Sequence, residues 1–409
     1  MKLTTVSNYI NHHRIPLSNR LYQALGEDYH FIQTEPMAAE RVNMGWGKDT
    51  KAIPYLKCFY EEPESCAKLI MDSDIVIFSG LEEESYIQER LKAGKIVIRG
   101  SERLYREGQW KAISPRGLRK KYIDHTRYRN APVYLLCHGA YVASDFNIVK
   151  AYPGKMFQWG YFTETKQYDL EELFRKKSMN HQNTVQNNTQ NHGEGRDQVN
   201  LLWAGRFLKL KHPEYAIEAA KRLKEQNISF HLDMIGDGEM AETCRELVKT
   251  YQLEQQVSFL GFHAPDEVRT YMEQADIFLF TSNYLEGWGA VLNESMNSGC
   301  AVVTDASIGA VPFLIKHGRN GMVYKDGNLD EFCSYVLQLA QDDTLRRTIG
   351  EAAYHTITDL WNPDHAAKCL LEFCTGLLER GMNLQPEGPL SPAPIISPRN
   401  GYQFTRNNF

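Results

Sequence analysis

The chain has 409 residues, more than one hydrophobic core usually serves, because single cores stop growing at roughly 250 to 300 residues. Hydrophobic residues make up 42% and charged residues 24%, as in ordinary globular proteins. A net charge of -5 gives no general attraction to phosphate backbones, so we expect no nucleic-acid partner and a chain of two domains.

The N-terminal residues do not resemble a targeting signal. MKLTTVSNYI lacks a charged flank and a long apolar centre, and no uncharged apolar run approaches the ~18 residues of a membrane span. The eight cysteines are scattered without a Cys-x2-Cys pair, and Cys137 and Cys300 lie in apolar runs where a reduced thiol acts as a small hydrophobe. We therefore expect a cytoplasmic protein with structural cysteines.

The N-terminal half, residues 1–165, predicts a Rossmann-like domain. Its strand candidates are MKLTTVS, SDIVIFSG, KIVIRGS and PVYLLCHG, with helices near Leu17 to Leu25 and Ser85 to Ala93. Residues 166–199 are expected to be an interdomain linker, because Lys176 to Gln198 is rich in Asn and Gln and nearly free of large apolar residues.

The C-terminal half, residues 200–361, alternates apolar runs with helical patterns. The runs are NLLWAG, SFHLDMIG, QVSFLG, ADIFLFTS, CAVVTD and GMVYKD. Such alternation predicts a parallel sheet covered by helices on both faces, with functional loops at the carboxyl ends of its strands. Residues 362–382 predict a further helix, and the proline-rich tail 383–409 is expected to be poorly ordered.

Four segments carry a resemblance to a known family: AGRFLKLK (204–211), IGDGE (235–239), VSFLGF (257–262) and SNYLEGWGAVLNESMNSGCAVV (282–303). In this order they resemble the family 4 glycosyltransferases of the GT-B fold, over about residues 200–378. The resemblance implies an α/β chain of two Rossmann-like, doubly wound domains that face each other across a cleft. The C-terminal domain would bind a nucleotide sugar, the N-terminal domain the acceptor, and the helix at 362–382 would return to the N-terminal domain.

Two cations stand where a diphosphate needs them. Arg206 and Lys211 lie in a loop that leaves one strand and enters a helix, the position from which long cationic side chains reach a site. A sugar-nucleotide diphosphate gains charge as the glycosidic bond breaks, so fixed positive charge beside it is required. The resemblance implies this catalytic role for both residues; on position alone, solvated loop charges would be the favoured interpretation.

The stretch EGWGAVLNE carries an acidic pair with seven residues between its members. Gly287 and Gly289 allow backbone amides to approach a ligand, and a helix is expected to begin near Ala290. The resemblance implies that Glu286 lies by the donor sugar and that Glu294 accepts hydrogen bonds from ribose hydroxyls; surface charges are the alternative. Trp288 we interpret mainly as packing beneath the loop rather than stacking on a base.

Two further turns border the nucleotide by resemblance, although in a generic Rossmann protein they are merely structural: Gly236 and Gly238 in IGDGE, and Leu260 and Gly261 in the turn after VSFLG. The only Asp-x-Asp, Asp72 and Asp74, starts a strand rather than ending one. We therefore expect no metal and no cofactor, and the resemblance implies transfer with retention of configuration.

The acceptor side departs from the family pattern. In place of a glycine pair in the first strand-to-helix loop, the chain has SNYINHHRIP, and Ser101 or Glu102 takes roughly the place of a histidine after a middle strand. Acceptor contacts are expected from loops that end strands, or else these are ordinary surface and packing residues: Asn11, His12, His13, Arg14, Ser101, Glu102 and His138.

A basic segment suggests contact with a membrane. PRGLRKKYIDHTRYR, 115–129, carries six Lys or Arg against one Asp, with tyrosines between them. It suits peripheral binding to the anionic inner face of a membrane, which would fit a lipid-linked acceptor, or it is a solvated face.

The function expected from the resemblance is transfer of a sugar from a nucleotide diphosphate sugar, with a UDP-sugar favoured, to a glycan or lipid-linked acceptor in surface polysaccharide biosynthesis. Two alternatives stay open: a nucleotide-sugar 2-epimerase, which needs no acceptor, and a non-catalytic sugar-nucleotide-binding subunit.

Overall fold

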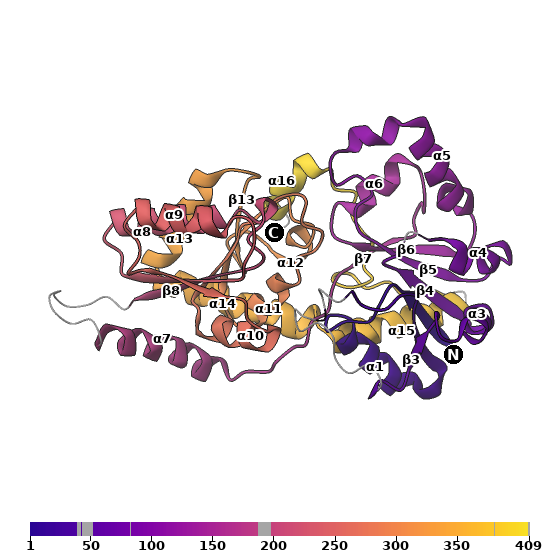
Figure 1. The fold of residues 1–409 in the computed structure, drawn as a ribbon. Helices are drawn as coiled ribbons and strands as arrows, with labels where there is room; N and C mark the ends of the chain where they lie inside the picture. Colours follow the sequence, from indigo (N-terminus) through magenta and orange to yellow (C-terminus); the bar gives the residue numbers. More distant parts are fainter. Residues whose placement is uncertain (39–41, 43–51, 82, 187–197, 380, 408–409) are drawn as a thin grey trace. The chain divides into compact units, whose positions relative to one another are not determined.

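The computed structural model describes residues 1–38, 42, 52–81, 83–186, 198–379 and 381–407 (Figure 1). For residues 179–186 only the backbone is described. The chain forms two compact units, one of Met1–Glu164 with Leu360–Ser397 and the other of Thr165–Asp359 with Pro398–Phe409. Within these ranges, every helix is too short or too polar to cross a lipid bilayer.

The N-terminal unit is built on a parallel sheet. Its described strands follow the order β3-β2-β1-β4-β5-β6-β7, and every pairing is parallel. The strands are β1 (Leu3–Ser7), β2 (Tyr29–Gln33), β3 (Leu56–Cys58), β4 (Ile75–Ser79), β5 (Val97–Ser101), β6 (Val133–His138) and β7 (Met156–Trp159). Since β1 pairs with both β2 and β4, the strand order reverses between β1 and β4, which is where doubly wound sheets bind ligands.

Helices cover this sheet and bury its strands. β1 and β4 are buried along their whole length, as expected for a sheet covered on both faces. The helices are α1 (Ile15–Leu25), α3 (Pro63–Asp72), α4 (Ser85–Lys92), α5 (Pro115–Asp124), α6 (Val142–Ile148) and α15 (Pro363–Glu379), with shorter turns η1 (Gly26–Asp28), η3 (Gln109–Ile113) and η4 (Thr126–Tyr128). The helix expected at 362–382 is α15, which lies beside α1 (Figure 1) and is joined to it by the Arg20–Asp364 ion pair.

The C-terminal unit holds a second parallel sheet, with the order β10-β9-β8-β11-β12-β13 among its described strands. The strands are β8 (Val199–Ala204), β9 (Phe230–Ile235), β10 (Val257–Gly261), β11 (Ile277–Phe280), β12 (Ala301–Asp305) and β13 (Met322–Tyr324). The surrounding helices are α8 (Pro213–Glu225), α9 (Ala241–Thr250), α10 (Pro265–Gln274), α11 (Val291–Asn297), α12 (Val311–Leu314), α13 (Leu329–Gln341) and α14 (Asp343–His355). Here the order reverses between β8 and β11, which are adjacent.

The prediction of an interdomain linker over residues 166–199 is wrong for the first part of that segment. α7 (Leu170–Gln186) is a helix, and its buried residues Leu173 and Lys177 attach it to the C-terminal unit. The Lys177 ammonium donates hydrogen bonds to the carbonyls of Met272 and Ala275, at the end of α10, which satisfies the buried charge. The remainder of that segment, 187–197, lies outside the described residues.

The tail is packed rather than poorly ordered. Leu390 and Ile396 are buried, and Ala393 N donates to the Met156 carbonyl at 2.9 Å, so this segment belongs to the N-terminal unit. After the short turn η7 (Pro398–Asn400), α16 (Gly401–Asn407) packs in the C-terminal unit. The chain passes between units at η6 (Thr356–Leu360), a single π-helical turn.

Candidate functional site

In the C-terminal unit, the loops after β8 and β11 are tied together. These strands are neighbours, so their carboxyl ends lie at one edge of the sheet. Thr281 Oγ1 donates to the Lys211 carbonyl at 2.6 Å, and Asn283 N donates to the Leu210 carbonyl at 2.9 Å. Trp203 Nε1 in turn donates to Thr281 Oγ1 at 2.9 Å. The loop that carries Lys211 is therefore held against the loop that carries Glu286.

Lys211 and Glu286 form an ion pair, as Lys211 Nζ contacts Glu286 Oε2. Their side chains are only 18% and 15% exposed, so neither is a solvated loop charge. Glu286 is also held by its backbone, because its N–H donates to the Asn283 carbonyl at 2.9 Å. The structure thus brings together a cation and a carboxylate expected to meet at the donor.

Arg206 belongs to the same loop but is not brought into this pair. Its side chain is exposed, and within the described residues it forms no ion pair or side-chain hydrogen bond. Position and charge leave it able to reach a ligand, yet its diphosphate role stays a prediction.

Glu294 lies in α11, one element beyond Glu286. Burial raises the pKa of its carboxyl to about 7, against the opposing charge of Arg269, while Asp266 adds to the rise. Its carboxylate forms no hydrogen bond with any residue the structure describes. A poorly solvated carboxylate with open acceptor positions can take hydroxyl donors from a ligand.

Trp288 is packed inside the turn. Its ring is 1% exposed, and its Nε1 donates to Asn293 Oδ1 at 2.8 Å. This burial favours the packing interpretation over stacking on a base. Gly289 has a φ of +81°, and a Cβ there would overlap the Phe280 ring, so only glycine fits. Gly287 and Ala290, the N-cap of α11, complete the turn.

The glycines after β9 are explained by backbone packing. A Cβ on Gly236 would overlap the Gly205 carbonyl, and one on Gly238 would lie 2.7 Å from the Phe207 carbonyl. Gly236 N donates to the Gly261 carbonyl at 2.7 Å, which links this turn to the end of β10 beside Leu260. The three turns form one edge, and nucleotide contact by these residues stays a prediction.

Asp305, at the end of β12, belongs to the same edge and was missed by the sequence interpretation. It is 2% exposed; burial raises its pKa to about 6, although Ser307 N donates to its Oδ1 at 2.7 Å. The hydroxyls of Thr304, the preceding residue, and of Tyr324 in the neighbouring strand β13 are buried without a partner among the described residues. The only available signal was an Asp-Ala-Ser sequence that follows an apolar strand.

In the N-terminal unit, the predicted acceptor residues gather around Tyr161, which the sequence interpretation also missed. Its ring lies 6.2 Å from that of His13 and 5.7 Å from that of His138, and its hydroxyl donates to Glu102 Oε1 at 2.9 Å. Three loops, after β1, β5 and β6, therefore meet at this residue. His12 lies against His13, with ring centroids 3.7 Å apart.

The two other predicted acceptor residues have local structural roles. Asn11 Oδ1 accepts from His13 N at 3.1 Å, and the Asn11 carbonyl accepts from Arg14 N at 2.9 Å. Ser101 Oγ donates to the Glu102 carbonyl at 2.8 Å. Acceptor binding by either residue stays a prediction.

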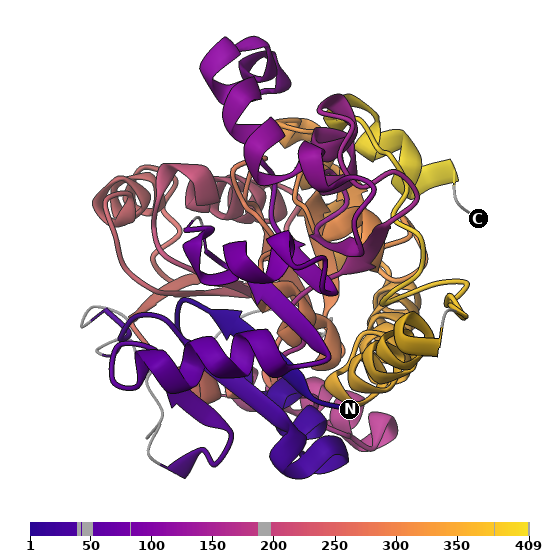
Figure 2. The same ribbon diagram turned by 90° about the vertical axis from the view of Figure 1, so that its right-hand side faces the viewer.

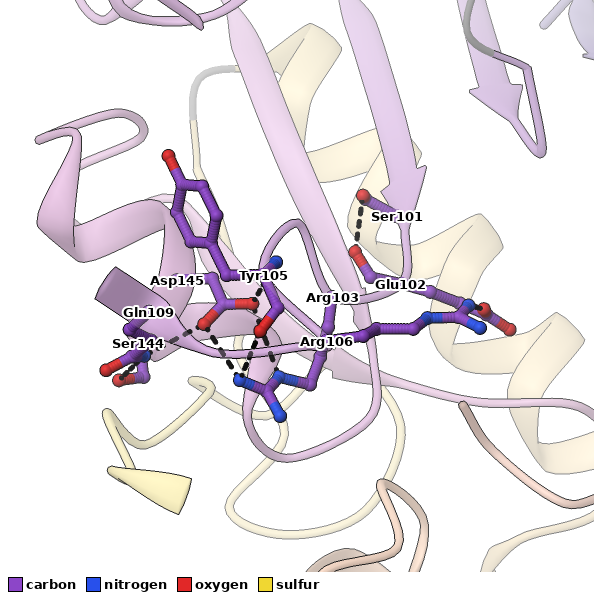
Figure 3. A network of polar contacts seen from close by, with 8 residues as sticks. All are labelled: Ser101, Glu102, Arg103, Tyr105, Arg106, Gln109, Ser144 and Asp145. Carbon is purple, nitrogen blue, oxygen red and sulfur yellow. Dashed lines mark hydrogen bonds and ion pairs between the residues drawn. The ribbon is translucent and has the colours of Figure 1, made fainter. Parts of the chain in front are cut away.

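A buried polar network holds the loop after β5 (Figure 3). Asp145 of α6 is fully buried and accepts hydrogen bonds from Arg103, from Tyr105 N at 3.0 Å and from Gln109 Nε2 at 2.8 Å. Arg106 forms an ion pair with Glu102 at the other end of the loop. The network fixes the path of residues 101–109 and so holds Glu102 near Tyr161.

Metal ligands do not gather in the described part of the chain, where no group of three or more His, Cys, Asp or Glu side chains is placed to hold an ion. Asp74 instead accepts a hydrogen bond from Lys2 N at 2.8 Å, a structural role at the start of β4. Metal-independent chemistry stays a prediction.

In comparison with known proteins, the C-terminal unit is similar in sequence to glycosyltransferases. Residues 184–356, less than half of the chain, match the family described as glycosyl transferases group 1. The putative colanic acid biosynthesis glycosyltransferase WcaL of Salmonella typhimurium is 28% identical over 161 residues, 38% of this chain and 39% of that protein. The amylovoran biosynthesis glycosyltransferase AmsK of Erwinia amylovora is 30% identical over 150 residues, 36% of this chain and 37% of that protein. The alignments thus span about two fifths of the length of these relatives.

Solved structures resemble nearly the whole chain. Anabaena Alr3699/HepE in complex with UDP gives a TM-score of 0.66 at 15% identity, covering 92% of this chain and 100% of that one. The lipopolysaccharide outer core galactosyltransferase WaaB gives 0.61 at 15% identity, covering 93% and 99%. At such identities the likeness concerns the fold alone. The predicted fold class, two Rossmann-like α/β domains of the GT-B type, is confirmed.

Proposed function

We propose that the chain is a retaining glycosyltransferase that moves a sugar from a UDP-sugar to a glycan or lipid-linked acceptor. The observation that carries this proposal is the Lys211–Glu286 pair at the carboxyl edge of the C-terminal sheet, with Glu294 in the following helix. The match to glycosyl transferases group 1 covers these residues and supports the proposal.

The charged residues of this site have different roles in binding the donor. Lys211, with Arg206 from the same loop, neutralises the diphosphate as its charge grows, so the site needs neither metal nor cofactor. Glu286 accepts hydrogen bonds from hydroxyls of the transferred sugar, and Glu294 accepts them from the ribose. Glu286 is the counter-ion of Lys211; a diphosphate beside Lys211 would take over that role and leave Glu286 to the sugar.

Retention follows if the acceptor hydroxyl attacks the face from which the nucleotide departs. The departing phosphate oxygen then takes the hydroxyl proton, and the protein holds the two substrates and stabilises charge. No covalent enzyme intermediate is required, so Glu286 need not act as a nucleophile.

Surface polysaccharide biosynthesis is the proposed setting, in the cytoplasm. Two relatives that align with the C-terminal unit are named for colanic acid and amylovoran biosynthesis, and they support this setting. The UDP-bound Anabaena neighbour supports the choice of uridine over guanosine.

A surface of the N-terminal unit supports peripheral contact with a membrane. In η3, Trp110 is 68% and Ile113 79% exposed, and in α5 Leu118 and Tyr122 are exposed one helical turn apart. The exposed cations Arg116, Arg119 and Lys120 lie among them, and α5 buries none of its residues. In Figure 2 this purple segment stands at the top of its unit, away from the strands. Apolar side chains beside cations suit an anionic lipid surface, which is where a lipid-linked acceptor would be found.

A donor panel tests the proposed function. The full chain is incubated with UDP-sugars and GDP-sugars, with and without extracted lipid-linked glycan, and nucleotide diphosphate release is measured. Release that requires the acceptor, with mass spectrometry showing an acceptor heavier by one sugar and NMR showing a retained anomeric configuration, is the expected result. Conversion of the donor sugar without an acceptor would instead indicate an epimerase, and wild-type function of a Glu286→Ala chain in cells would indicate a non-catalytic subunit.

A further inference from the structure

Arg14 lies at the point where the strand order of the N-terminal sheet reverses. It precedes α1, and one of its guanidinium nitrogens contacts Ser7 Oγ at the end of β1. Ser7 Oγ also donates to the Ser79 carbonyl, at the end of β4, at 2.6 Å. Since β1 and β4 are neighbours, Arg14 is fixed between the carboxyl ends of the two strands at which the sheet reverses.

Two glycines leave room for polar side chains at this edge. Gly80 follows β4 with a φ of +75°, and a Cβ there would lie 2.6 Å from Arg14 Nη2. In β5, a Cβ on Gly100 would lie 2.9 Å from His138 Nε2 and 2.6 Å from Ser79 Oγ. The Arg14 guanidinium and the His138 imidazole thus occupy space that a side chain at position 80 or 100 would fill.

Among the residues that the structure describes, no carboxylate balances the charge of Arg14. No ion pair joins its guanidinium to an Asp or Glu of the described residues, and the groups that act on its charge are the phenols of Tyr161, Tyr9 and Tyr29. Burial lowers the pKa of Arg14, and burial followed by the Arg14 charge lowers the pKa of His138 to about 3. A cation in poorly solvated surroundings without a counter-ion is costly, and an anionic ligand would offset that cost.

We infer that the Arg14 edge of the N-terminal sheet binds an oxyanion of the acceptor, a phosphate or carboxylate, with the Arg14 guanidinium as its cation and His138 as a second contact. That this oxyanion belongs to the acceptor rests on the proposed function, whereas the presence of an anion site does not. A guanidinium offers paired N–H donors that match two oxygens of such a group, and neutral His138 can donate one hydrogen bond. Acceptors that carry phosphate fit this site, and neutral glycans without an anionic group do not.

Histidine NMR of the full chain tests the site with inorganic pyrophosphate as the probe. Ring signals are recorded over a pH series with pyrophosphate or with potassium chloride of equal ionic strength, and the His138 signal is identified by its loss in His138→Asn. In the wild type, pyrophosphate should shift this signal and raise the pH at which it titrates. Arg20→Gln, a control six residues further along in α1, should behave as wild type; Arg14→Gln should not respond, and Arg14→Lys should bind roughly tenfold more weakly.

Any of the following results would overturn the inference. One is a His138 signal that pyrophosphate does not move, and the second is an equal response in wild type and Arg14→Gln. If Arg14→Gln does not fold, the Arg14→Lys titration decides, and unchanged affinity there is the contrary result. The third is a tenfold loss of UDP affinity in the Arg14 variants, which would assign the anion to the donor. Failure of the sugar-transfer assay alone would leave the pyrophosphate result standing, so the two proposals are tested separately.

Discussion

Lys211 and Glu286, 75 positions apart in the sequence, form an ion pair in the C-terminal unit. They meet because β8 and β11 are adjacent, and because Thr281 and Asn283 bind the loop after β8 through its carbonyls. The pairing holds one cation and one carboxylate in a fixed relation to each other. Such preorganisation avoids the cost of arranging charges during the reaction.

Glu294 should make donor binding depend on pH. Its pKa of about 7 means that the carboxylate, the better acceptor for ribose hydroxyls, becomes the main form only above that pH. UDP affinity, measured by calorimetry, should therefore increase from about pH 6 to about pH 8 in the wild type. Glu294→Gln should bind UDP more weakly and lose that increase relative to wild type; an identical pH profile in both chains would contradict the assignment.

The same group should lower stability as the pH rises. A carboxyl whose pKa is higher in the folded than in the unfolded chain favours folding while protonated, and this contribution is lost between its ordinary pKa and about 7. The difference in unfolding free energy between wild type and Glu294→Gln should change by up to roughly 3 kcal/mol over that window. Urea unfolding at several pH values measures it.

The Arg103–Asp145 pair should be a main support of the loop after β5. Its side chains are 7% and 0% exposed, so Asp145→Asn, which leaves Arg103 buried without a counter-ion, should cost about 3 to 5 kcal/mol of unfolding free energy. Arg106→Gln breaks the more exposed pair with Glu102 and should cost less than about 1 kcal/mol. Thermal unfolding compares the two; equal costs would show that the buried network does not dominate.

The apolar and basic surface of η3 and α5 should bind anionic vesicles. Cosedimentation of the full chain should be strong with vesicles containing phosphatidylglycerol, weak with phosphatidylcholine alone, and reduced by salt. Replacing Arg116, Arg119 and Lys120 by Gln should weaken binding by about 3 kcal/mol, at about 1 kcal/mol per cation. Trp110→Ser should also weaken it, whereas Ile395→Ser, at a residue 57% exposed elsewhere in the unit, should not. Equal binding by all variants would show that this surface does not contact the vesicles.

Gly236 and Gly261 should differ in their tolerance of a side chain. Both have positive φ, but a Cβ on Gly236 would overlap the Gly205 carbonyl, whereas nothing lies within 4 Å of one on Gly261. Gly261→Ala should therefore cost about 1 to 2 kcal/mol through backbone strain alone, and Gly236→Ala should cost roughly 3 kcal/mol or more. Similar shifts in the unfolding temperature would show that the β9 turn is free to move.

The C-terminal sheet was predictable because its described strands are mostly apolar and alternate regularly along the chain with helical patterns. In the N-terminal unit β2, β3 and β7 were missed, since LKC is only three residues long and polar residues interrupt YHFIQ and MFQW. α7 was missed because composition does not reveal that Leu173 and Lys177 find a surface to pack against. In each case tertiary contacts decide the structure.

The site shows the same division. The spacing of the motifs predicted Lys211, Glu286 and Glu294 as site residues. It did not predict the contact between Lys211 and Glu286, because that contact depends on β8 and β11 being neighbours in the sheet. Asp305 and Tyr161 carried no distinguishing signal, because a single Asp or Tyr after a strand is common. Arg14 was predicted as one polar loop residue among four. Only the structure shows that it lies between β1 and β4 and that no described carboxylate pairs with it.

The central claim is that Lys211 supplies the charge beside the donor diphosphate, and calorimetric binding of UDP tests it most directly. Lys211→Gln is compared with Lys209→Gln, an exposed lysine of the same loop, after thermal unfolding has shown both to be folded. Lys211→Gln should bind UDP roughly tenfold to a hundredfold more weakly than wild type, since a charge-assisted contact contributes about 1.5 to 3 kcal/mol, and Lys209→Gln should bind as wild type does. Equal affinity in Lys211→Gln and wild type would contradict the account.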